Sequence, residues 1–532
     1  MLKEKAKITI SYSIDEGKEE SEVKTVKLVT NPTETDFWRE IGKVLYSIPN
    51  IVYSKNRERK QLYYVDITSN YGNATIKVIG RGQFIDDDTS VIYHSKFHQM
   101  EFNSVFGLEE SSFSKVYLTC LHVESARGLG NYKFYQLEQE KEKIIATYGR
   151  IGASVGEKYG IRDTRNSPNP FYHCDYWIRY YEKLQKGYID LSHVYLTEFI
   201  ANTNDIDYID IDDNKTSFSV NKIAQDLYDR LLNYAKGVVK KNLKENIRIT
   251  VGMLEESKKV FEEMKESAIE KDIKKFNKTL KYLLQISPRR ILNMKELFAT
   301  NENDFDDILT REETLINAME VLKKRKDGII DNDELQIKRI NKKETFNSTI
   351  KVELATDEEV QEVKGYLNDR LQKQIVNVYK VINTEKENNF DNYCKQNNIK
   401  EIKKLWHGSI NANWLSIINN GLSMSVKVAN GSMFGRGIYF APSCEKSFNY
   451  TSMRGSYWAK GNDSVAFMGL YKCAYGNPHI ENSWGTYDET ILKQLNKNCV
   501  HAKSGVALRN DEIIFYNENA MSMEYLVEFK SC

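Results

Sequence analysis

Four short motifs in the C-terminal third decide how this sequence folds and which chemistry it carries. In chain order they are Leu405-Trp-His-Gly-Ser409, Met433-Phe-Gly-Arg-Gly-Ile-Tyr-Phe-Ala441, Lys446-Ser-Phe-Asn-Tyr450 and Asn510-Asp-Glu-Ile-Ile-Phe-Tyr516. Taken one at a time, a histidine after a tryptophan or a tyrosine in an apolar run is an ordinary part of a sheet core. Four such motifs in order predict one functional site assembled from separate segments.

The series resembles the catalytic signature of the poly(ADP-ribose) polymerase family, whose His, Tyr and Glu correspond to His407, Tyr439 and Glu512. The resemblance covers residues 345–532. It implies an NAD⁺ ADP-ribosyltransferase, a pentosyl transfer in which NAD⁺ is the co-substrate, nicotinamide is released and no metal takes part. It also implies a catalytic domain built on a mixed, largely antiparallel split sheet.

Cleavage of the nicotinamide–ribose bond passes through an oxocarbenium-like state, so the enzyme fixes the ribose hydroxyls and stabilises positive charge. By the resemblance, His407 hydrogen-bonds the adenosine-side ribose. Glu512 hydrogen-bonds the nicotinamide-side ribose and orients the acceptor. Tyr439 and Tyr450 flank the flat nicotinamide ring. The residues expected to bind NAD⁺ are His407, Gly408, Ser409, Asn413, Tyr439, Ser447 and Tyr450.

The carboxamide of nicotinamide has its own expected partners. By the same resemblance, the backbone N–H and C=O of Gly408 hold it, and the hydroxyl of Ser447 donates to it. The motif Gly435-Arg-Gly-Ile-Tyr lacks the third glycine and the strand-then-helix setting of a dinucleotide-binding loop, which excludes a Rossmann interpretation.

The adenosine side departs from the family pattern. An arginine commonly follows the Asn/Gln-Gly-Leu triplet in the family, whereas Gly421-Leu422 is followed here by Ser423, and the donor loop of residues 423–432 is short. Lys427 supplies a positive charge but not the fork of a guanidinium, so we do not count it as a site residue.

Two further regions resemble parts of the DNA-dependent members of this family. Residues 216–325 have helical periodicity and are similar to the helical regulatory domain. Residues 104–195 are similar to the module named for a Trp-Gly-Arg motif, which is Tyr148-Gly149-Arg150 here. A tyrosine can stack on a sugar or base and an arginine can contact phosphate, so these residues are the expected DNA contacts. The alternative is a β-bulge or turn glycine beside two surface side chains.

The sequence predicts a multi-domain α+β protein. Apolar residues alternate from Ile8 to Ile14 before a polar turn and a second run, which indicates a hairpin. A helix is expected over residues 33–45 and a second hairpin around Asn70-Tyr71-Gly72. The predicted parts are an N-terminal α+β module of unknown role (1–103), the β-rich module (104–195), an acidic linker (196–215), the helical bundle (216–325) and the catalytic domain (345–532).

Composition narrows the class of protein and names no partner. Hydrophobic residues at 41%, charged residues at 28% and seven prolines are typical of a globular chain. Because 76 basic residues nearly cancel 75 acidic ones, a nucleic-acid surface would be a local patch. The seven cysteines never occur at two-residue spacing, so no zinc ribbon is indicated. No leader or membrane span is expected. We therefore expect an intracellular protein, nuclear in a eukaryote and otherwise cytoplasmic.

We expect a protein that is a monomer in isolation and that transfers ADP-ribose from NAD⁺ to protein side chains, its own included. DNA ends or nicks would stimulate it, which points to DNA repair. The glutamate permits elongation into polymer without requiring it. One alternative is a toxin-like mono-ADP-ribosyltransferase without DNA control, favoured if the helical region packs away from the NAD⁺ cleft. The other is a non-enzymatic scaffold that binds DNA ends or ADP-ribose, which the complete set of His407, Tyr439 and Glu512 disfavours.

Overall fold

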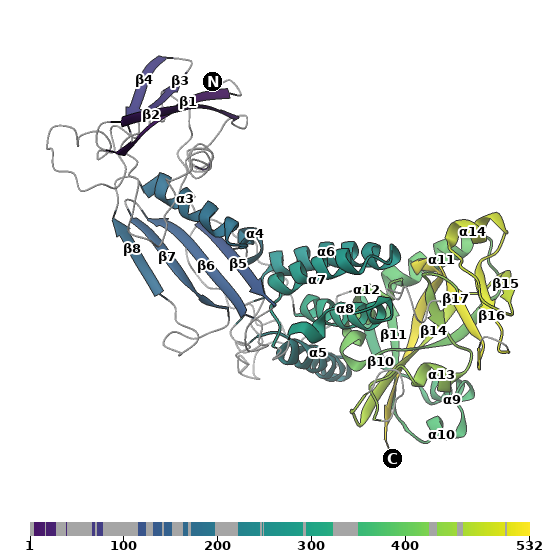
Figure 1. Cartoon of the computed structure of the whole chain (residues 1–532). Coiled ribbons are helices and arrows are strands. Elements are labelled where there is room, and N and C mark those ends of the chain that lie inside the picture. The colour runs from purple at the N-terminus through teal and green to yellow at the C-terminus, as the bar shows by residue number, and fades with distance from the viewer. Residues whose placement is uncertain are drawn as a thin grey trace. The chain divides into compact units, whose positions relative to one another are not determined.

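The structure, a computed structural model of the chain, contains two compact units, residues 1–197 and residues 198–532 (Figure 1). Among the residues that it describes, no helix combines the length and apolarity needed to cross a membrane. These residues are 5–15, 18–27, 39, 66–69, 72–77, 115–123, 131–140, 143–151, 163–168, 172–196, 222–244, 247, 249–290, 294–322, 349–424, 433–454, 461–505 and 508–531.

The first unit begins with the two predicted hairpins. Strand β1 (Lys5–Asp15) pairs antiparallel with β2 (Lys18–Lys27), and β3 (Asp66–Ser69) pairs with β4 (Gly72–Lys77). The four strands form one sheet in the order β2-β1-β3-β4. Alternation of apolar residues and turn chemistry therefore predicted both hairpins correctly. The helix expected over residues 33–45 lies outside the described residues, apart from helical Arg39.

A second, antiparallel sheet of order β8-β7-β6-β5-β9 completes the first unit. Helix α3 lies along this sheet and contacts β6 and β7 (Figure 1), and the hydroxyl of buried Tyr176 donates to the Leu137 carbonyl at 3.3 Å. The β-rich content predicted for this region is confirmed. The elements are β5 (Lys115–His122), β6 (Asn131–Glu140), β7 (Lys143–Arg150), β8 (Asp163–Pro168), α3 (Tyr172–Gln185), β9 (Ile189–Asp190) and α4 (Ser192–Tyr195).

The second unit opens with the predicted helical bundle. Thr250 caps α6 by accepting from the Met253 N–H, and Asp272 caps α7 in the same way. Helix α7 ends just before Pro288, which cannot continue a helix. The elements are α5 (Lys222–Asn242), α6 (Val251–Ile269), α7 (Ile273–Ile286), η1 (Met294–Leu297), η2 (Glu302–Asp304) and α8 (Phe305–Val321). The acidic run expected to be a linker lies outside the described residues.

Two sheets form the catalytic region, which confirms its predicted helical and antiparallel content. The first has the order β10-β11-β18-β14-β12 and is antiparallel throughout, and the second has the order β13-β17-β16-β15, with only β15 and β16 parallel. The strands are β10 (Ile350–Leu354), β11 (Ile375–Asn383), β12 (Ile402–Gly408), β13 (Ile438–Phe440), β14 (Val465–Ala474), β15 (Pro478–Glu481), β16 (Cys499–Ala502), β17 (Glu512–Phe515) and β18 (Met521–Lys530).

Short helices connect these strands. Thr356 begins the first of them with a capping box, in which the Thr356 hydroxyl accepts from the Glu359 N–H and the Glu359 carboxylate accepts from the Thr356 N–H. The helices are α9 (Asp357–Gly365), α10 (Asp369–Gln372), α11 (Thr384–Gln396), η3 (Asn411–Asn413), α12 (Trp414–Asn420), α13 (Cys444–Phe448), α14 (Glu489–Gln494) and η4 (Glu518–Ala520).

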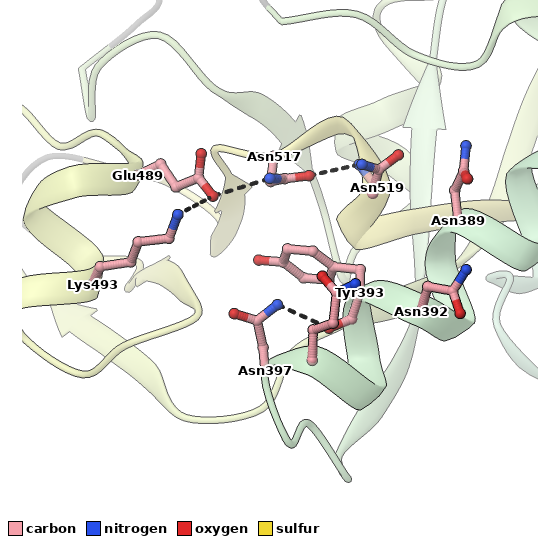
Figure 2. Close-up of a pocket in the computed structure, with 9 residues that line it drawn as sticks. Asn389, Asn392, Tyr393, Asn397, Glu489, Lys493, Asn517 and Asn519 are labelled. Carbon is pink, nitrogen blue, oxygen red and sulfur yellow. Dashed lines mark hydrogen bonds and ion pairs between the residues drawn. The ribbon is translucent and has the colours of Figure 1, made fainter.

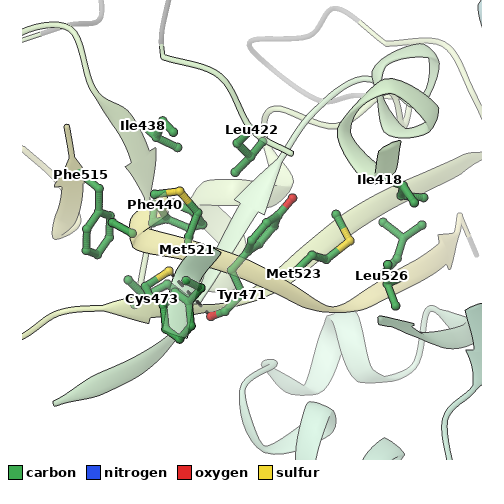
Figure 3. Packing of buried hydrophobic residues seen from close by; sticks show 14 of the residues in the cluster. Ile418, Leu422, Ile438, Phe440, Tyr471, Cys473, Phe515, Met521, Met523 and Leu526 are labelled. Atoms are coloured by element: carbon green, nitrogen blue, oxygen red, sulfur yellow. Dashed lines mark hydrogen bonds between the residues drawn. The ribbon is translucent and has the colours of Figure 1, made fainter. Parts of the chain in front are cut away.

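One buried cluster joins the sheets to the helical bundle. Figure 3 shows Tyr471 and Leu526 of the first sheet packed with Phe440 and other residues of the second. Leu227 and Leu231 of α5 are fully buried members of the same cluster. Each buried leucine contributes roughly 2 kcal/mol. The bundle is therefore packed into the catalytic core through α5.

Candidate active site

His407 and Tyr439 meet where the two sheets join. Trp406, one residue before His407, exchanges two backbone hydrogen bonds of 3.1 Å with Ala441, just after β13. His407 Nδ1 consequently lies 3.0 Å from the Tyr439 carbonyl oxygen. A carbonyl only accepts, so Nδ1 carries a proton and Nε2 of a neutral ring is an acceptor. Burial lowers the pKa of His407 to about 4, which keeps the ring neutral at neutral pH.

The hydroxyl of Tyr439 is used within its own turn. It donates to the Gly435 carbonyl at 2.8 Å and accepts from the Phe434 N–H at 3.2 Å. Gly435 has a φ of +89°, and a Cβ there would lie 2.2 Å from the Tyr487 carbonyl oxygen, so only glycine fits. We therefore expect Tyr439 to meet a ligand with its ring and not with its hydroxyl.

Gly408 lies directly against α13. A Cβ at Gly408 would be 1.8 Å from the Ser447 carbonyl oxygen and 3.3 Å from Cβ of Tyr450, so a larger residue would displace the helix. The Ser447 side chain is 4% exposed and its hydroxyl donates to the Trp406 carbonyl at 2.8 Å. Ser447 therefore ties α13 to β12. The Ser447 hydroxyl must give up its hydrogen bond to the Trp406 carbonyl before it can donate to the nicotinamide carboxamide, as the resemblance implies.

Glu512 opens β17, and its carboxylate meets a lysine that sequence reasoning missed. Lys446 Nζ of α13 lies 2.5 Å from Glu512 Oε1 and also donates to the Asn510 carbonyl at 3.1 Å. Burial, and then the negative charge of Glu512, raise the pKa of Tyr450 to about 12, so its hydroxyl stays protonated. The position of Lys446 beside Ser447 in the third motif is the signal that could have identified it.

Ser409 and Asn413 follow on the side expected to hold adenosine. The Asn413 amide donates to the Ser409 hydroxyl at 3.0 Å. Within the described part of the chain, Asn413 Oδ1 is buried and has no hydrogen-bond partner. An unpaired buried acceptor costs about 1–3 kcal/mol, and a ribose or adenine donor would satisfy it. These residues therefore fit NAD⁺. Of the donor loop, residues 425–432 lie outside the described residues.

The predicted DNA contacts lie at the end of β7. Tyr148 and Arg150 are two residues apart and so share a face of the sheet, with Tyr135 and Lys133 opposite them on β6. The rings of Tyr148 and Tyr135 stack at 5.8 Å, and Lys183 Nζ lies 4.1 Å from the centre of the Tyr135 ring. The β6–β7 register runs unbroken through this motif, which excludes the bulge considered as an alternative. We call these five side chains the aromatic and basic face.

A separate hollow of about 400 Å³ lies between α11, α14 and η4 (Figure 2). None of the predicted NAD⁺ residues lines it, so it does not belong to the site described above. Among the described residues no group of three His, Cys, Asp or Glu side chains could hold a metal ion. The lining residues are Asn389, Asn392, Tyr393, Gln396, Asn397, Glu489, Lys493, Asn517 and Asn519.

Comparison with known proteins identifies a family to which part of this chain is similar. Residues 357–477 match the family described as the poly(ADP-ribose) polymerase catalytic domain. A poly(ADP-ribose) polymerase-like protein of Invertebrate iridescent virus 6 is 29% identical over 182 residues, covering 32% of this chain and 95% of the viral protein. Poly [ADP-ribose] polymerase 2 of Homo sapiens is 50% identical over 155 residues, which covers 23% of this chain and 26% of the human protein. The poly [ADP-ribose] polymerase of Drosophila melanogaster is 36% identical over 104 residues, 19% of this chain and 10% of the fly protein.

The chain thus spans nearly all of the viral relative and about a quarter or less of the human and fly relatives. The match to a poly(ADP-ribose) polymerase catalytic domain, together with relatives named as poly(ADP-ribose) polymerases, supports an NAD⁺ ADP-ribosyltransferase enzyme.

Proposed function

We propose that the protein transfers ADP-ribose from NAD⁺ to protein side chains, its own included, and that DNA ends or nicks stimulate the reaction. One observation carries the catalytic part of the proposal. Glu512, paired with Lys446, lies beside Tyr450, and α13 presses Ser447 against Gly408. A carboxylate, a protonated phenol and an open backbone edge are thereby brought together.

The surroundings of each residue support its task in holding NAD⁺. Nε2 of neutral His407 accepts from a hydroxyl of the adenosine-side ribose. Gly408 is the last residue of β12, a strand at the edge of its sheet, so we expect its backbone N–H and C=O to receive the nicotinamide carboxamide. The rings of Tyr439 and Tyr450 flank the nicotinamide ring.

Glu512 performs the transfer step in this proposal. Its carboxylate accepts from a hydroxyl of the nicotinamide-side ribose and faces the positive charge that develops as the bond from C1′ to nicotinamide breaks. The electron pair of that bond leaves with nicotinamide. The acceptor group then bonds to C1′, and any proton that it carries passes to Glu512. Lys446 holds the carboxylate in the orientation that this step requires.

Two observations support control by DNA. Exposed Arg150 and half-buried Tyr148, at the end of the aromatic and basic face, offer positive charge and an aromatic ring for a nucleic acid, whereas Tyr135 is buried beneath Lys183 of α3. Helix α5 contacts η3, which carries Asn413, so the helical region lies next to the expected NAD⁺ cleft and not away from it. A helix in that place can restrain NAD⁺ binding until DNA binding shifts the population toward a competent state. Such a protein would act in DNA repair, in the nucleus of a eukaryotic cell.

One observation favours the DNA-independent alternative. About a third of this chain accounts for nearly the whole viral relative, so a protein of catalytic-domain size exists among its relatives. A transferase of that kind would modify protein without any response to DNA.

The test uses the full chain, labelled NAD⁺ and a 5′-phosphorylated nicked duplex, with products resolved by size. Transfer of label to protein that rises with nicked duplex supports the proposal, and Glu512→Gln serves as the inactive control. Absence of transferred label overturns the proposed enzyme. Transfer that is equal with and without DNA, across salt concentrations at which DNA stays bound, supports the toxin-like alternative.

A further inference from the structure

A chain of two hydrogen bonds, the first of them buried, crosses the second sheet and ends one residue before Glu512. Tyr475, directly after β14, places its hydroxyl 2.6 Å from Nδ1 of His501 in β16. His501 Nε2 in turn lies 2.9 Å from Oδ2 of Asp511, the residue before β17. Tyr475 and His501 are each 6% exposed and the Asp511 side chain is 25% exposed, so the chain runs from the interior toward the surface.

One arrangement of protons satisfies all three groups. An ionised carboxylate only accepts, so Nε2 of His501 carries the proton that it shares with Asp511. Nδ1 of the neutral ring is then an acceptor, and the Tyr475 hydroxyl donates to it. Burial lowers the pKa of His501, which favours this neutral ring. Burial alone would raise the pKa of Asp511, but hydrogen bonds from Ser504, Lys503 and His501 outweigh it and hold that pKa below its usual range.

Asp511 also ties together the two ends of the connection between β16 and β17. Its Oδ1 accepts from the Ser504 N–H at 2.7 Å, and its Oδ2 accepts from Lys503 Nζ at 3.0 Å. Both donors come directly after β16, at whose last residue Ala502 pairs with Glu512. The peptide that leads into Glu512 is therefore fixed to the neighbouring strand by three separate donors.

We propose that Tyr475, His501 and Asp511 are positioning residues that hold Glu512 in the orientation needed for transfer. Lys446 binds the Glu512 carboxylate itself, whereas these residues set the backbone from which Glu512 extends. The inference rests on the proposed function, because it assumes that Glu512 acts on the ribose. A displacement of about 1 Å in a catalytic group can lower a rate by on the order of a hundredfold, so loss of this chain should act on turnover.

The experiment compares full-length variants by steady-state kinetics with NAD⁺ and by equilibrium binding of nicotinamide. His501→Leu and Asp511→Ala should lower kcat by about ten- to a hundredfold. Both the KM for NAD⁺ and the nicotinamide Kd should stay within about twofold, because the pocket residues keep their own contacts. His501→Gln should recover most of kcat, since its amide can still donate to Asp511.

Two further variants make the result decisive. Tyr475→Phe removes a single oxygen and should lower kcat by about fivefold, the equivalent of one neutral hydrogen bond, even if His501→Leu fails to fold. The matched control is His479→Leu in the same sheet, because His479 Nε2 lies 2.9 Å from the Tyr487 hydroxyl and is not part of this chain of bonds. Its kcat should stay within about twofold of wild type.

The outcomes separate this inference from the proposed function. If Glu512→Gln abolishes transfer while Tyr475→Phe and Asp511→Ala keep wild-type kcat, the inference is overturned and the proposed function stands. A parallel loss of nicotinamide binding and kcat also overturns it, because the residues would then support the whole pocket. If Glu512→Gln keeps its turnover, the proposed function itself fails.

Discussion

Arg230→Ala tests how firmly the helical bundle is attached to the catalytic sheet. Arg230 of α5 donates from Nη1 to Glu528 Oε1 at 2.6 Å, and from Nη2 to Glu528 Oε2 at 3.2 Å and to the Tyr379 hydroxyl at 2.6 Å. The Glu528 side chain is 4% exposed and the Arg230 side chain 33%. This is a buried carboxylate of β18 held by a guanidinium from the bundle.

The expected loss in the free energy of unfolding depends on the hydrogen bonds that Glu528 keeps after Arg230 is replaced. Asn377 and Tyr379 still donate to Glu528 at 2.9 Å each. Breaking a fully buried pair costs about 3–5 kcal/mol. Two donors remain and part of the arginine is in solvent, so we expect the free energy of unfolding to fall by about 2 kcal/mol. Arg230→Lys keeps the charge without the fork and should cost about half as much.

The pH dependence of this loss has a definite sign. Burial would raise the pKa of Glu528, but hydrogen bonds from Arg230 and Asn377 outweigh it and lower that pKa. A lowered carboxylate pKa contributes stability that is present above the ordinary glutamate value and is lost as pH falls through the lowered value. The difference between wild type and Arg230→Ala should therefore shrink in acid.

Urea unfolding at neutral and acid pH measures the stability, and initial rates without DNA measure the restraint. If α5 holds the chain in an NAD⁺-incompetent state, a loss of about 2 kcal/mol shifts that equilibrium by roughly 30-fold, and basal turnover rises toward the DNA-stimulated level. Lys258→Ala is the control, because its pair with Glu320 is exposed and lies within the bundle, so it should cost under about 1 kcal/mol. A lower stability with unchanged basal turnover would refute the restraint, and an unchanged stability would refute the energetic argument.

Three further predictions concern the site and its control. Glu512→Gln should remove most transfer and leave NAD⁺ binding intact, because the amide keeps the shape and loses the charge; unchanged turnover in a labelled-NAD⁺ assay contradicts the assignment. Tyr439→Ala should weaken nicotinamide binding and His407→Ala should weaken NAD⁺ binding, each by about 1–3 kcal/mol in a titration, and wild-type affinity in either variant would place the pocket elsewhere. Arg150→Ala should lower the DNA-stimulated rate and leave the basal rate unchanged. Equal losses in both rates would show that Arg150 does not act through DNA binding.

Deleting residues 216–325 should also raise basal turnover and abolish the response to DNA, but it is a harsher perturbation than Arg230→Ala. Leu227 and Leu231 of α5 are buried in the same cluster as Trp414 and Leu526. The deletion exposes that apolar surface to water, at a cost of several kcal/mol by area alone. Measured turnover of the deletion protein therefore has to be scaled by its folded fraction. Arg230→Ala needs no such scaling, because Leu227 and Leu231 stay buried in the core.

Local patterns predicted the local structure of this chain well. The alternation from Ile8 to Ile14 predicted a hairpin, and helical periodicity over residues 216–325 predicted the helices of the bundle. Each of these predictions depends on residues a few positions apart, which is the range over which periodicity and capping act.

Contacts between distant segments were beyond such patterns. Arg230 and Glu528 are 298 positions apart, and Lys446 reaches Glu512 only because α13 and β17 pack together. Nothing in the local sequence distinguishes these charges from exposed ones. His501 is a similar case, because a lone histidine in a short strand gives no sign that Tyr475 and Asp511 lie on either side of it.

The motif residues themselves fall into two groups that a resemblance does not separate. Ser447 and Gly408 belong to the motifs, yet the Ser447 hydroxyl binds the Trp406 carbonyl, and Gly408 is small because α13 occupies the space of its side chain. Gly435 likewise lies so close to the Tyr487 backbone that a side chain there would collide with it. Such residues set distances between segments, whereas His407 and Glu512 offer an imidazole nitrogen and a carboxylate oxygen for chemistry. The side-chain size or hydroxyl of a motif residue can therefore be required for activity without touching the substrate, and loss of activity on substitution identifies a catalytic group only when the fold of the site is shown to survive.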